Sequence, residues 1–125
     1  MIFFETTLPG AFRIEVERRG DARGFFARTF CQREFAARGL DTVFTQQNMS
    51  VSAHKGTLRG MHYQTGAHAE TKLIRCVRGA ILDVLIDLRP ESPTYRKWES
   101  FELTDVNKQM VYAPKGFAHG FQTLS

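Results

Sequence analysis

An arginine and a histidine lie close together in residues 55–64, KGTLRGMHYQ. An imidazole titrates close to neutral pH, so His62 can take a proton from carbon when the site keeps its ring neutral. The guanidinium of Arg59 makes a two-pronged bond to phosphate, which suits it to an anionic substrate. In a regular strand these two side chains point to opposite faces. We therefore expect either a bulge at Gly60 that brings them together, or an Arg59 that acts from the rim.

A second polar segment is residues 44–52, FTQQNMSVS, which is strand-like but dense in amides and hydroxyls. Side chains such as Gln47 and Asn48 satisfy a polar ligand better than they fill a core. An exposed sheet face explains the same pattern equally well. Both interpretations stay open.

Asp83 lies in the middle of an apolar alternating segment, residues 80–88. A lone carboxylate is costly there unless a charged or hydrogen-bonding group pairs with it. It can orient His62, pair with Lys72, or form an ion pair that serves only structure. We include it among the candidate catalytic residues.

Short strands must position these residues. Alternation predicts strands over 12–16, 98–103 and 110–113, and a hairpin over 72–88 with its turn at Arg78-Gly79. The one predicted helix covers 31–40, with Phe35 and Ala36 facing inward and Gly39 ending it. Many short strands and regular turns predict an all-β protein, an antiparallel barrel or jelly roll with one short helix.

Composition narrows the function classes. The chain has 125 residues, 42% of them hydrophobic, which suits a single domain. The net charge of +4 is modest and its basic residues are dispersed, so we expect no nucleic-acid partner. We find neither a signal peptide nor an apolar run long enough to span a membrane, which predicts a cytoplasmic protein without a membrane partner. Two cysteines without a CxxC pair do not form a disulfide framework.

The two histidine segments, 56–62 and 114–119, together resemble the paired motifs of the cupin barrel. In the second, Pro-x-Gly-x-x-His is complete and ends at His119. Metal-binding cupins usually carry His-x-His in the first motif, but here the second histidine position is Gln64. Two dependable histidines are few for a divalent ion, so no metal and no cofactor are expected.

The chain is similar nearly end to end to the dTDP-4-dehydrorhamnose 3,5-epimerases, which are cupin-fold enzymes of deoxysugar-nucleotide synthesis. The matching residues, in order, are Asp21-x-Arg23-Gly24-x-Phe26, Gln47-Asn48-x-Ser50, Gly56-Thr57-Leu58-Arg59-Gly60-x-His62-x-Gln64, Lys72-Leu73 with Arg75, Gly79, Asp83-Val84, Asp87-Leu88-Arg89, Ser92-Pro93-Thr94-Tyr95 and Ala113-Pro114-x-Gly116-Phe117-Ala118-His119-Gly120-Phe121.

The resemblance implies a metal-free epimerisation, at C3, C5 or both, of a 4-keto-6-deoxyhexose carried on a nucleoside diphosphate. Removing a proton next to a ketone gives an enolate, so the site needs a base, a group that holds the enolate oxygen, and an acid on the opposite face. By the family pattern His62 is the base and Lys72 steadies the oxygen. By the same resemblance, the diphosphate or sugar is contacted by Arg23, Arg59 and His119. The nucleotide is contacted by Gln47 and Asn48.

Two departures from the family pattern stand out. Arg28 occupies a substrate-facing position where relatives commonly have glutamate, so the nucleotide or sugar preference can differ. The tyrosine expected as catalytic acid falls beyond Ser125, which predicts a single cupin domain, 1–125, incomplete at its C-terminal end. The resemblance also implies a homodimer, in which residues 3–7 can cross to the partner.

Two other functions compete with an epimerase. A metal-dependent cupin oxygenase or isomerase would use His62 and His119 with Glu70 or His68 as ligands. A non-catalytic cupin would bind a sugar nucleotide without converting it, as the missing acid suggests.

Overall fold

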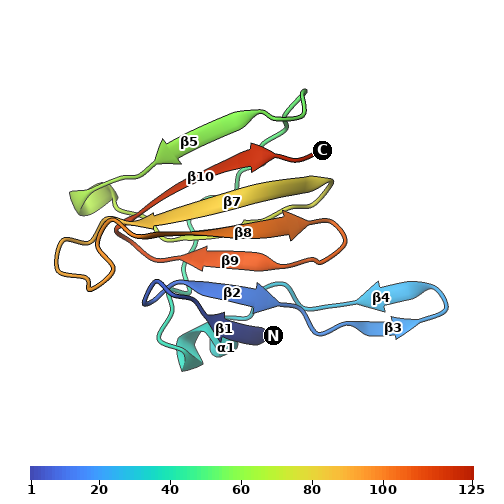
Figure 1. Ribbon diagram of the computed structural model, residues 1–125. Coiled ribbons are helices and arrows are strands. Elements are labelled where there is room, and N and C mark those ends of the chain that lie inside the picture. The colour runs from blue at the N-terminus through green and yellow to red at the C-terminus, as the bar shows by residue number, and fades with distance from the viewer.

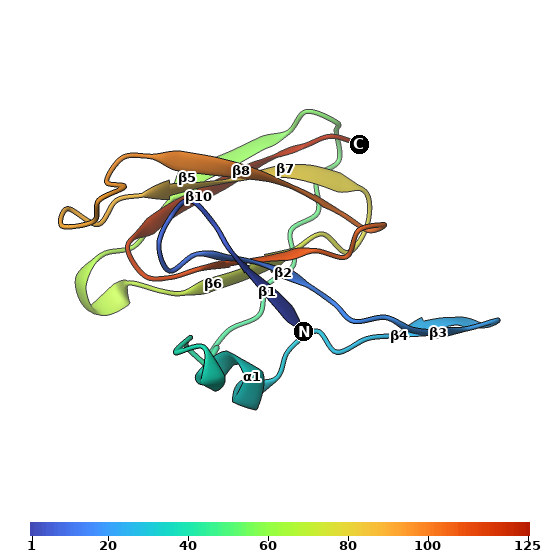
Figure 2. The ribbon, with the colours of Figure 1, turned by 60° about the horizontal axis from the view of Figure 1, so that its bottom comes forward.

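Two four-stranded sheets lie face to face in the computed structural model, which describes residues 1–125 (Figures 1 and 2). The first contains, in spatial order, β1 (Ile2–Glu5), β2 (Phe12–Glu15), β9 (Met110–Ala113) and β6 (Lys72–Arg75). The second contains β5 (Leu58–His62), β10 (Phe117–Thr123), β7 (Ala80–Asp87) and β8 (Trp98–Thr104). Every pairing is antiparallel. The expected all-β jelly roll is confirmed.

The main core lies between the two sheets. Alternation along β7 directs Leu85 inward, where it is fully buried, together with Val111 of β9 and Phe101 of β8. The same alternation buries Asp83 and Asp87 completely on this inward face. A carboxylate inside an apolar core needs hydrogen-bonding or charged partners, and Asp83 and Asp87 differ in the number and kind of partners that they have.

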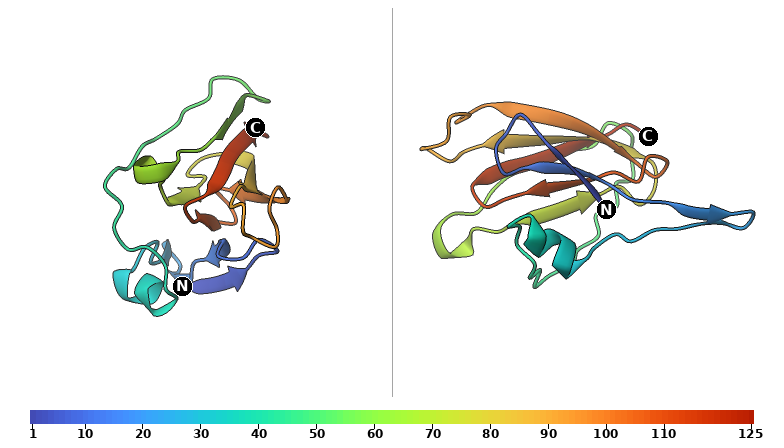
Figure 3. Two further views of the ribbon diagram at one scale, coloured as in Figure 1. Left: turned by 90° about the vertical axis from the view of Figure 1, so that its left-hand side faces the viewer. Right: turned by 90° about the horizontal axis from the view of Figure 1, so that it is seen from below.

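A second apolar cluster covers the outer face of the first sheet. Helix α1 (Gln32–Ala37) places Phe35 against Tyr112 of β9 and Phe3 of β1, with ring centroids 6.0 and 5.6 Å apart. Figure 3 shows α1 below this sheet, on the side away from the second one. All four residues of β9 are buried because the strand is covered on both faces.

The helix is shorter than predicted, and only part of its predicted inward face is buried. Phe35 is fully buried, but Ala36 is exposed, so its prediction was wrong. Gly39 ends the helix as expected: its φ is +69° and its N–H donates to the carbonyl of Ala36. Glu34 in the first turn holds the N-terminal ammonium of Met1 at 3.0 Å.

The predicted hairpin over residues 72–88 is wrong. Both strands form, but β6 pairs with β9 in the first sheet while β7 pairs with β8 and β10 in the second. The turn at Arg78-Gly79 therefore passes from one sheet to the other. Two alternating segments joined by a Gly turn have the same local sequence pattern whether they form a hairpin or belong to different sheets. The two cases differ only in the strands with which the segments pair.

One other segment also differs from expectation. Residues 44–52 form no strand, and most of their side chains are exposed. A short hairpin of β3 (Arg19–Asp21) and β4 (Gly24–Phe26) projects away from the two sheets (Figure 3). Strand β1 pairs with β2 of its own chain, from Ile2↔Glu15 to Glu5↔Phe12.

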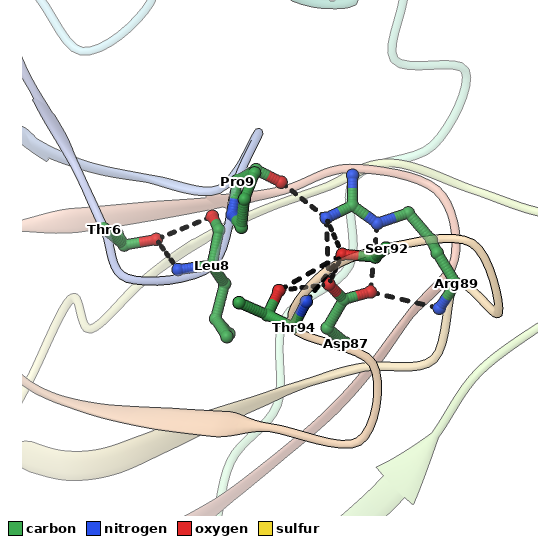
Figure 4. Close-up of polar contacts among 7 residues, drawn as sticks. All are labelled: Thr6, Leu8, Pro9, Asp87, Arg89, Ser92 and Thr94. Atoms are coloured by element: carbon green, nitrogen blue, oxygen red, sulfur yellow. Dashed lines mark hydrogen bonds and ion pairs between the residues drawn. The ribbon is translucent and has the colours of Figure 1, made fainter.

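Asp87 anchors the loop that follows β7 (Figure 4). Its carboxylate accepts hydrogen bonds from Arg89 Nε at 3.0 Å, Ser92 Oγ at 2.5 Å and Thr94 Oγ1 at 2.6 Å. Arg89 also donates from Nη2 to the carbonyl oxygen of Pro9 at 2.6 Å, which ties this loop to the one between β1 and β2. Burial raises the pKa of Asp87, but the hydrogen bonds from these three side chains outweigh it and hold the pKa well below its usual value.

The short turn η1 (Gly66–His68) connects β5 to β6. Neither it nor α1 is long and apolar enough to cross a membrane.

Candidate active site

Strand β5 carries the first candidate residues, and it has a bulge. His119 of β10 lies opposite His62, but Phe121, two residues on, lies opposite Arg59, three residues back on β5. The extra residue occurs next to Gly60, where β5 approaches β10 closely. A Cβ on Gly60 would lie 2.7 Å from both Gly120 Cα and the carbonyl oxygen of His119, so only glycine fits there.

The bulge decides the question that alternation left open. Residues directly opposite each other in paired strands share a face, so Arg59 lies on the face of Phe121 and His62 on the face of His119. Phe121 and His119 are two residues apart and share one face. Arg59 and His62 therefore lie on the same side of the sheet, which is the bulge alternative and not the rim alternative.

This shared face is the inward one. Phe121 lies opposite Asp83 and His119 opposite Leu85 on β7, and both of those side chains are fully buried. Strand β5 is at the edge of its sheet, so His62 at its end remains exposed. No hydrogen bond from the chain restrains its imidazole. His62 is therefore accessible to a ligand that enters between the sheets at this edge.

Lys72 faces the histidines from the opposite sheet. It lies opposite Ala113 of β9, a member of the core between the sheets, so its side chain starts on the inward face. The side chain is 23% exposed, and its ammonium lies 3.8 Å from a carboxylate oxygen of Glu70. Its positive charge acts on Asp83 across the space between the sheets.

Asp83 pairs with His119. Its Oδ1 lies 2.6 Å from Nε2 of His119, and neither His62 nor Lys72 makes a hydrogen bond to it. The suggestions that it orients His62 or forms a direct pair with Lys72 are therefore wrong. Burial raises the pKa of the Asp83 carboxyl, and the hydrogen bond and charge of His119 offset only part of that effect. The cost of a mid-strand carboxylate was readable from the sequence, but its partner depended on strand register.

Arg59 supports the exposed polar segment that precedes β5. It donates from Nη2 to the carbonyl oxygen of Val51 at 3.1 Å and from Nε to Ser52 Oγ at 3.3 Å. Gln47 and Asn48 lie in the same segment and are exposed and outside any strand. The side chain of Arg59 thus holds this segment at the start of β5.

Arg23 is not brought to this site. It lies at the tip of the β3–β4 hairpin, with its side chain 90% exposed and its guanidinium bound to Asp21. Arg28 also lies elsewhere: it donates to Glu34 of α1 at 3.0 Å. Neither arginine shares a face with His62 within one chain.

None of the three tyrosines lies beside His62 and His119 on the inward face. Tyr112 is buried under α1, where its hydroxyl accepts a hydrogen bond from the N–H of Asp41 at 2.9 Å. Tyr95 is in the loop after β7, and Tyr63 follows the end of β5 and is 55% exposed. His, Cys, Asp and Glu side chains form no group of three or more that could hold a metal ion.

Comparisons with known proteins show which family the chain is similar to. The family model described as dTDP-4-dehydrorhamnose 3,5-epimerase matches residues 5–125. A dTDP-4-dehydrorhamnose 3,5-epimerase of Sinorhizobium fredii is 43% identical over 124 residues, which cover 99% of this chain and 64% of that protein. The chain thus spans about two thirds of the length of such relatives.

Solved structures show the same similarity. The crystal structure of dTDP-4-dehydrorhamnose 3,5-epimerase from Elizabethkingia anophelis has a TM-score of 0.96 and 41% identity, covering 100% of this chain and 68% of that one. A Legionella pneumophila dTDP-6-deoxy-D-glucose-3,5-epimerase, solved in complex with dTDP-4-keto-L-rhamnose, has a TM-score of 0.91 and 38% identity over 99% of this chain and 65% of that one. From the match over residues 5–125 and these identities, the chain belongs to the dTDP-4-dehydrorhamnose 3,5-epimerase family.

Proposed function

We propose that the protein epimerises a dTDP-linked 4-keto-6-deoxyhexose at C3, C5 or both by removing a proton next to the ketone. The observation that supports it best is the placement of an unrestrained His62 directly across from His119, with Lys72 facing both from the other sheet. The Legionella relative, solved with a dTDP-4-keto sugar, supports the same substrate class.

The chemistry follows from these three side chains. His62 removes the proton from the carbon next to the ketone, and the electrons move to the carbonyl oxygen, which becomes an enolate. Lys72 holds that oxygen, because a positive charge in a partly dehydrated site stabilises developing negative charge. An acid on the opposite face of the same carbon then donates a proton to it, which completes the inversion.

The anionic part of the substrate needs a separate contact surface. Arg59 and the segment with Gln47 and Asn48 lie at the other end of β5 from His62. We assign the diphosphate to Arg59 and the nucleotide to the two amides, since a guanidinium pairs with phosphate and amides pair with a base.

We further propose that the protein works as a homodimer. The β3–β4 hairpin leaves the body of the chain, and Phe25 and Phe26 on it are 45% and 75% exposed. Two exposed aromatic residues on a projecting ribbon suit an interface. In a dimer, Arg23 at its tip can contact the substrate of the second copy. We place the protein in the cytoplasm, since its two cysteines are free thiols, as a reducing compartment favours.

Solvent deuterium exchange into dTDP-4-keto-6-deoxyglucose tests the reaction. The natural gene product should exchange deuterium at C3 or C5, and His62→Ala should lower the rate about 10²- to 10⁴-fold, the usual contribution of a general base. His68→Ala is the matched control, because His68 is exposed on η1, outside the site.

The other functions give different results. If chelation abolishes exchange and His68→Ala is as damaging as His62→Ala, a metal-dependent cupin explains the site better. Tight binding of the sugar nucleotide with no exchange would leave only a binding protein.

A further inference from the structure

Asp83 and Asp87 are chemically alike but are used differently. Both lie on the inward face of β7, four residues apart, and both are fully buried. Asp87 accepts hydrogen bonds from Arg89, Ser92 and Thr94, so it is well satisfied. In contrast, Asp83 has one partner, and its Oδ2 is the only buried side-chain polar atom of the chain without a hydrogen bond.

A buried carboxylate with one partner is a poor way to stabilise a fold. Removing a charge from water costs several kcal/mol, which a single hydrogen bond repays only in part. Groups that are kept in such an unfavourable state occur mostly at functional sites. The contrast with Asp87 therefore points to a role for Asp83 at the site, through the one side chain that it holds.

The hydrogen bond decides which ring nitrogen of His119 is left for a ligand. With Asp83 ionised, its carboxylate only accepts hydrogen bonds, and Nε2 of His119 is then the nitrogen that donates to it. Nδ1 is then the nitrogen that remains. The ring is 13% exposed, so it is not closed off from the space between the sheets.

The ionisable groups that share the inward face with this ring come from three strands. They are His62 and Arg59 on β5, Lys72 on β6 and Asp83 on β7. His62 lies directly opposite His119 on the neighbouring strand, where paired residues have Cβ atoms only about 5 Å apart. A base at His62 must reach a carbon of the sugar ring, so His119 faces the sugar and not the nucleotide.

We propose that Asp83 is a positioning residue that holds His119 by Nε2 and thereby presents Nδ1 to the sugar of the bound nucleotide sugar. This inference rests on the proposed function and narrows the role of His119 from the diphosphate or the sugar to the sugar alone. Nδ1 can accept a hydrogen bond from a sugar hydroxyl when the ring is neutral, or donate one to the C4 oxygen when it is protonated.

Binding of two ligands by the full-length protein tests the proposal. The first is dTDP, which has the diphosphate but no sugar, and the second is dTDP-6-deoxy-D-glucose, which lacks the ketone and cannot react. Calorimetry should show that Asp83→Asn and His119→Ala each weaken the second ligand by roughly tenfold, the loss expected for one hydrogen bond of this kind. Their affinity for dTDP should stay within about twofold of the wild type by the same reasoning.

The double variant Asp83→Asn/His119→Ala separates positioning from an independent effect. If Asp83 acts through His119, the double variant binds the deoxysugar nucleotide no more weakly than His119→Ala alone. Additive losses would overturn the proposal, as would equal losses for both ligands or an unchanged affinity in Asp83→Asn.

Asp87→Asn is the matched control for removing a buried carboxylate. It lies on the same strand and face but outside the site, so its affinity for both ligands should match the wild type. If it weakens the sugar ligand as much as Asp83→Asn does, general damage to β7 explains the result and the proposal fails. A wild-type protein that binds neither ligand would refute the proposed function itself, which is a different outcome.

Discussion

Gly60→Ala should damage both the stability and the activity of the protein, because Gly60 allows β5 and β10 to meet. Its φ is +97°, where an L-residue is strained by about 1–2 kcal/mol. The added Cβ would also lie 2.7 Å from two backbone atoms of β10, which cannot rotate away. Forcing atoms into such a contact costs about 1–3 kcal/mol more. We expect a loss of about 2–5 kcal/mol in the free energy of unfolding.

Gly56→Ala is the matched control for this substitution. Gly56 has a similar φ of +82°, but a Cβ there would meet no atom within 4 Å. It should therefore lose only the backbone contribution of about 1–2 kcal/mol. Urea unfolding of the two variants measures the difference, which isolates the contact between β5 and β10.

The same pair of variants tests the site. One of the two atoms that the new Cβ meets is the carbonyl oxygen of His119, so relief of the clash must move His119 relative to His62. A displacement of about 1 Å in a catalytic group can cost about 10²-fold in rate. Deuterium exchange should fall in Gly60→Ala but not in Gly56→Ala. Equal stabilities and equal exchange rates in both variants would refute the account of the bulge.

Two further predictions concern the fold. Asp87→Asn should lower the free energy of unfolding at pH 7 by about 3–5 kcal/mol, as for a broken buried charge pair. The pKa of Asp87 is lower in the folded protein than in the unfolded chain, where it is about 4. The stabilisation by ionised Asp87 is therefore present above about pH 4 and is lost as the pH falls. Urea titrations at pH 7 and pH 3 should thus show the gap to wild type narrowing in acid, and a constant gap would contradict this. Phe35→Ala should lower the free energy of unfolding by about 3–5 kcal/mol at both pH values, because Phe35 is fully buried between α1 and β9. A loss below about 1 kcal/mol would mean that the packing of α1 contributes little to stability.

Local pattern was enough to predict most of the strands. The segment 110–113 is a strand with the predicted bounds, and β7 has Asp83, Leu85 and Asp87 on one face as its alternation indicates. Side-chain alternation along a strand is a property of consecutive residues, so it can be read without knowing the partner strands. The family, too, was recognisable from ordered motifs, because they occur at fixed places along the chain.

Pairing between distant residues was the part that local pattern did not predict. Residues 72–88 looked like one hairpin, but their strands belong to different sheets. Residues 44–52 looked like a strand, but no neighbour pairs with them. Choice of partner depends on how apolar faces from the whole chain are buried together, which a window of ten residues does not contain.

The chemistry divides in the same way. The sequence by itself determined which side chains can act, since a base, an anion-binding arginine and a costly carboxylate are recognisable from His62, Arg59 and Asp83. Only the tertiary structure decided which of them meet. The bulge at Gly60 turns Arg59 to the face of His62, and the register of β10 brings His119 within hydrogen-bond distance of Asp83, diagonally across on β7. The physical reason is that a shift of one residue in pairing sends a side chain to the opposite face of the sheet.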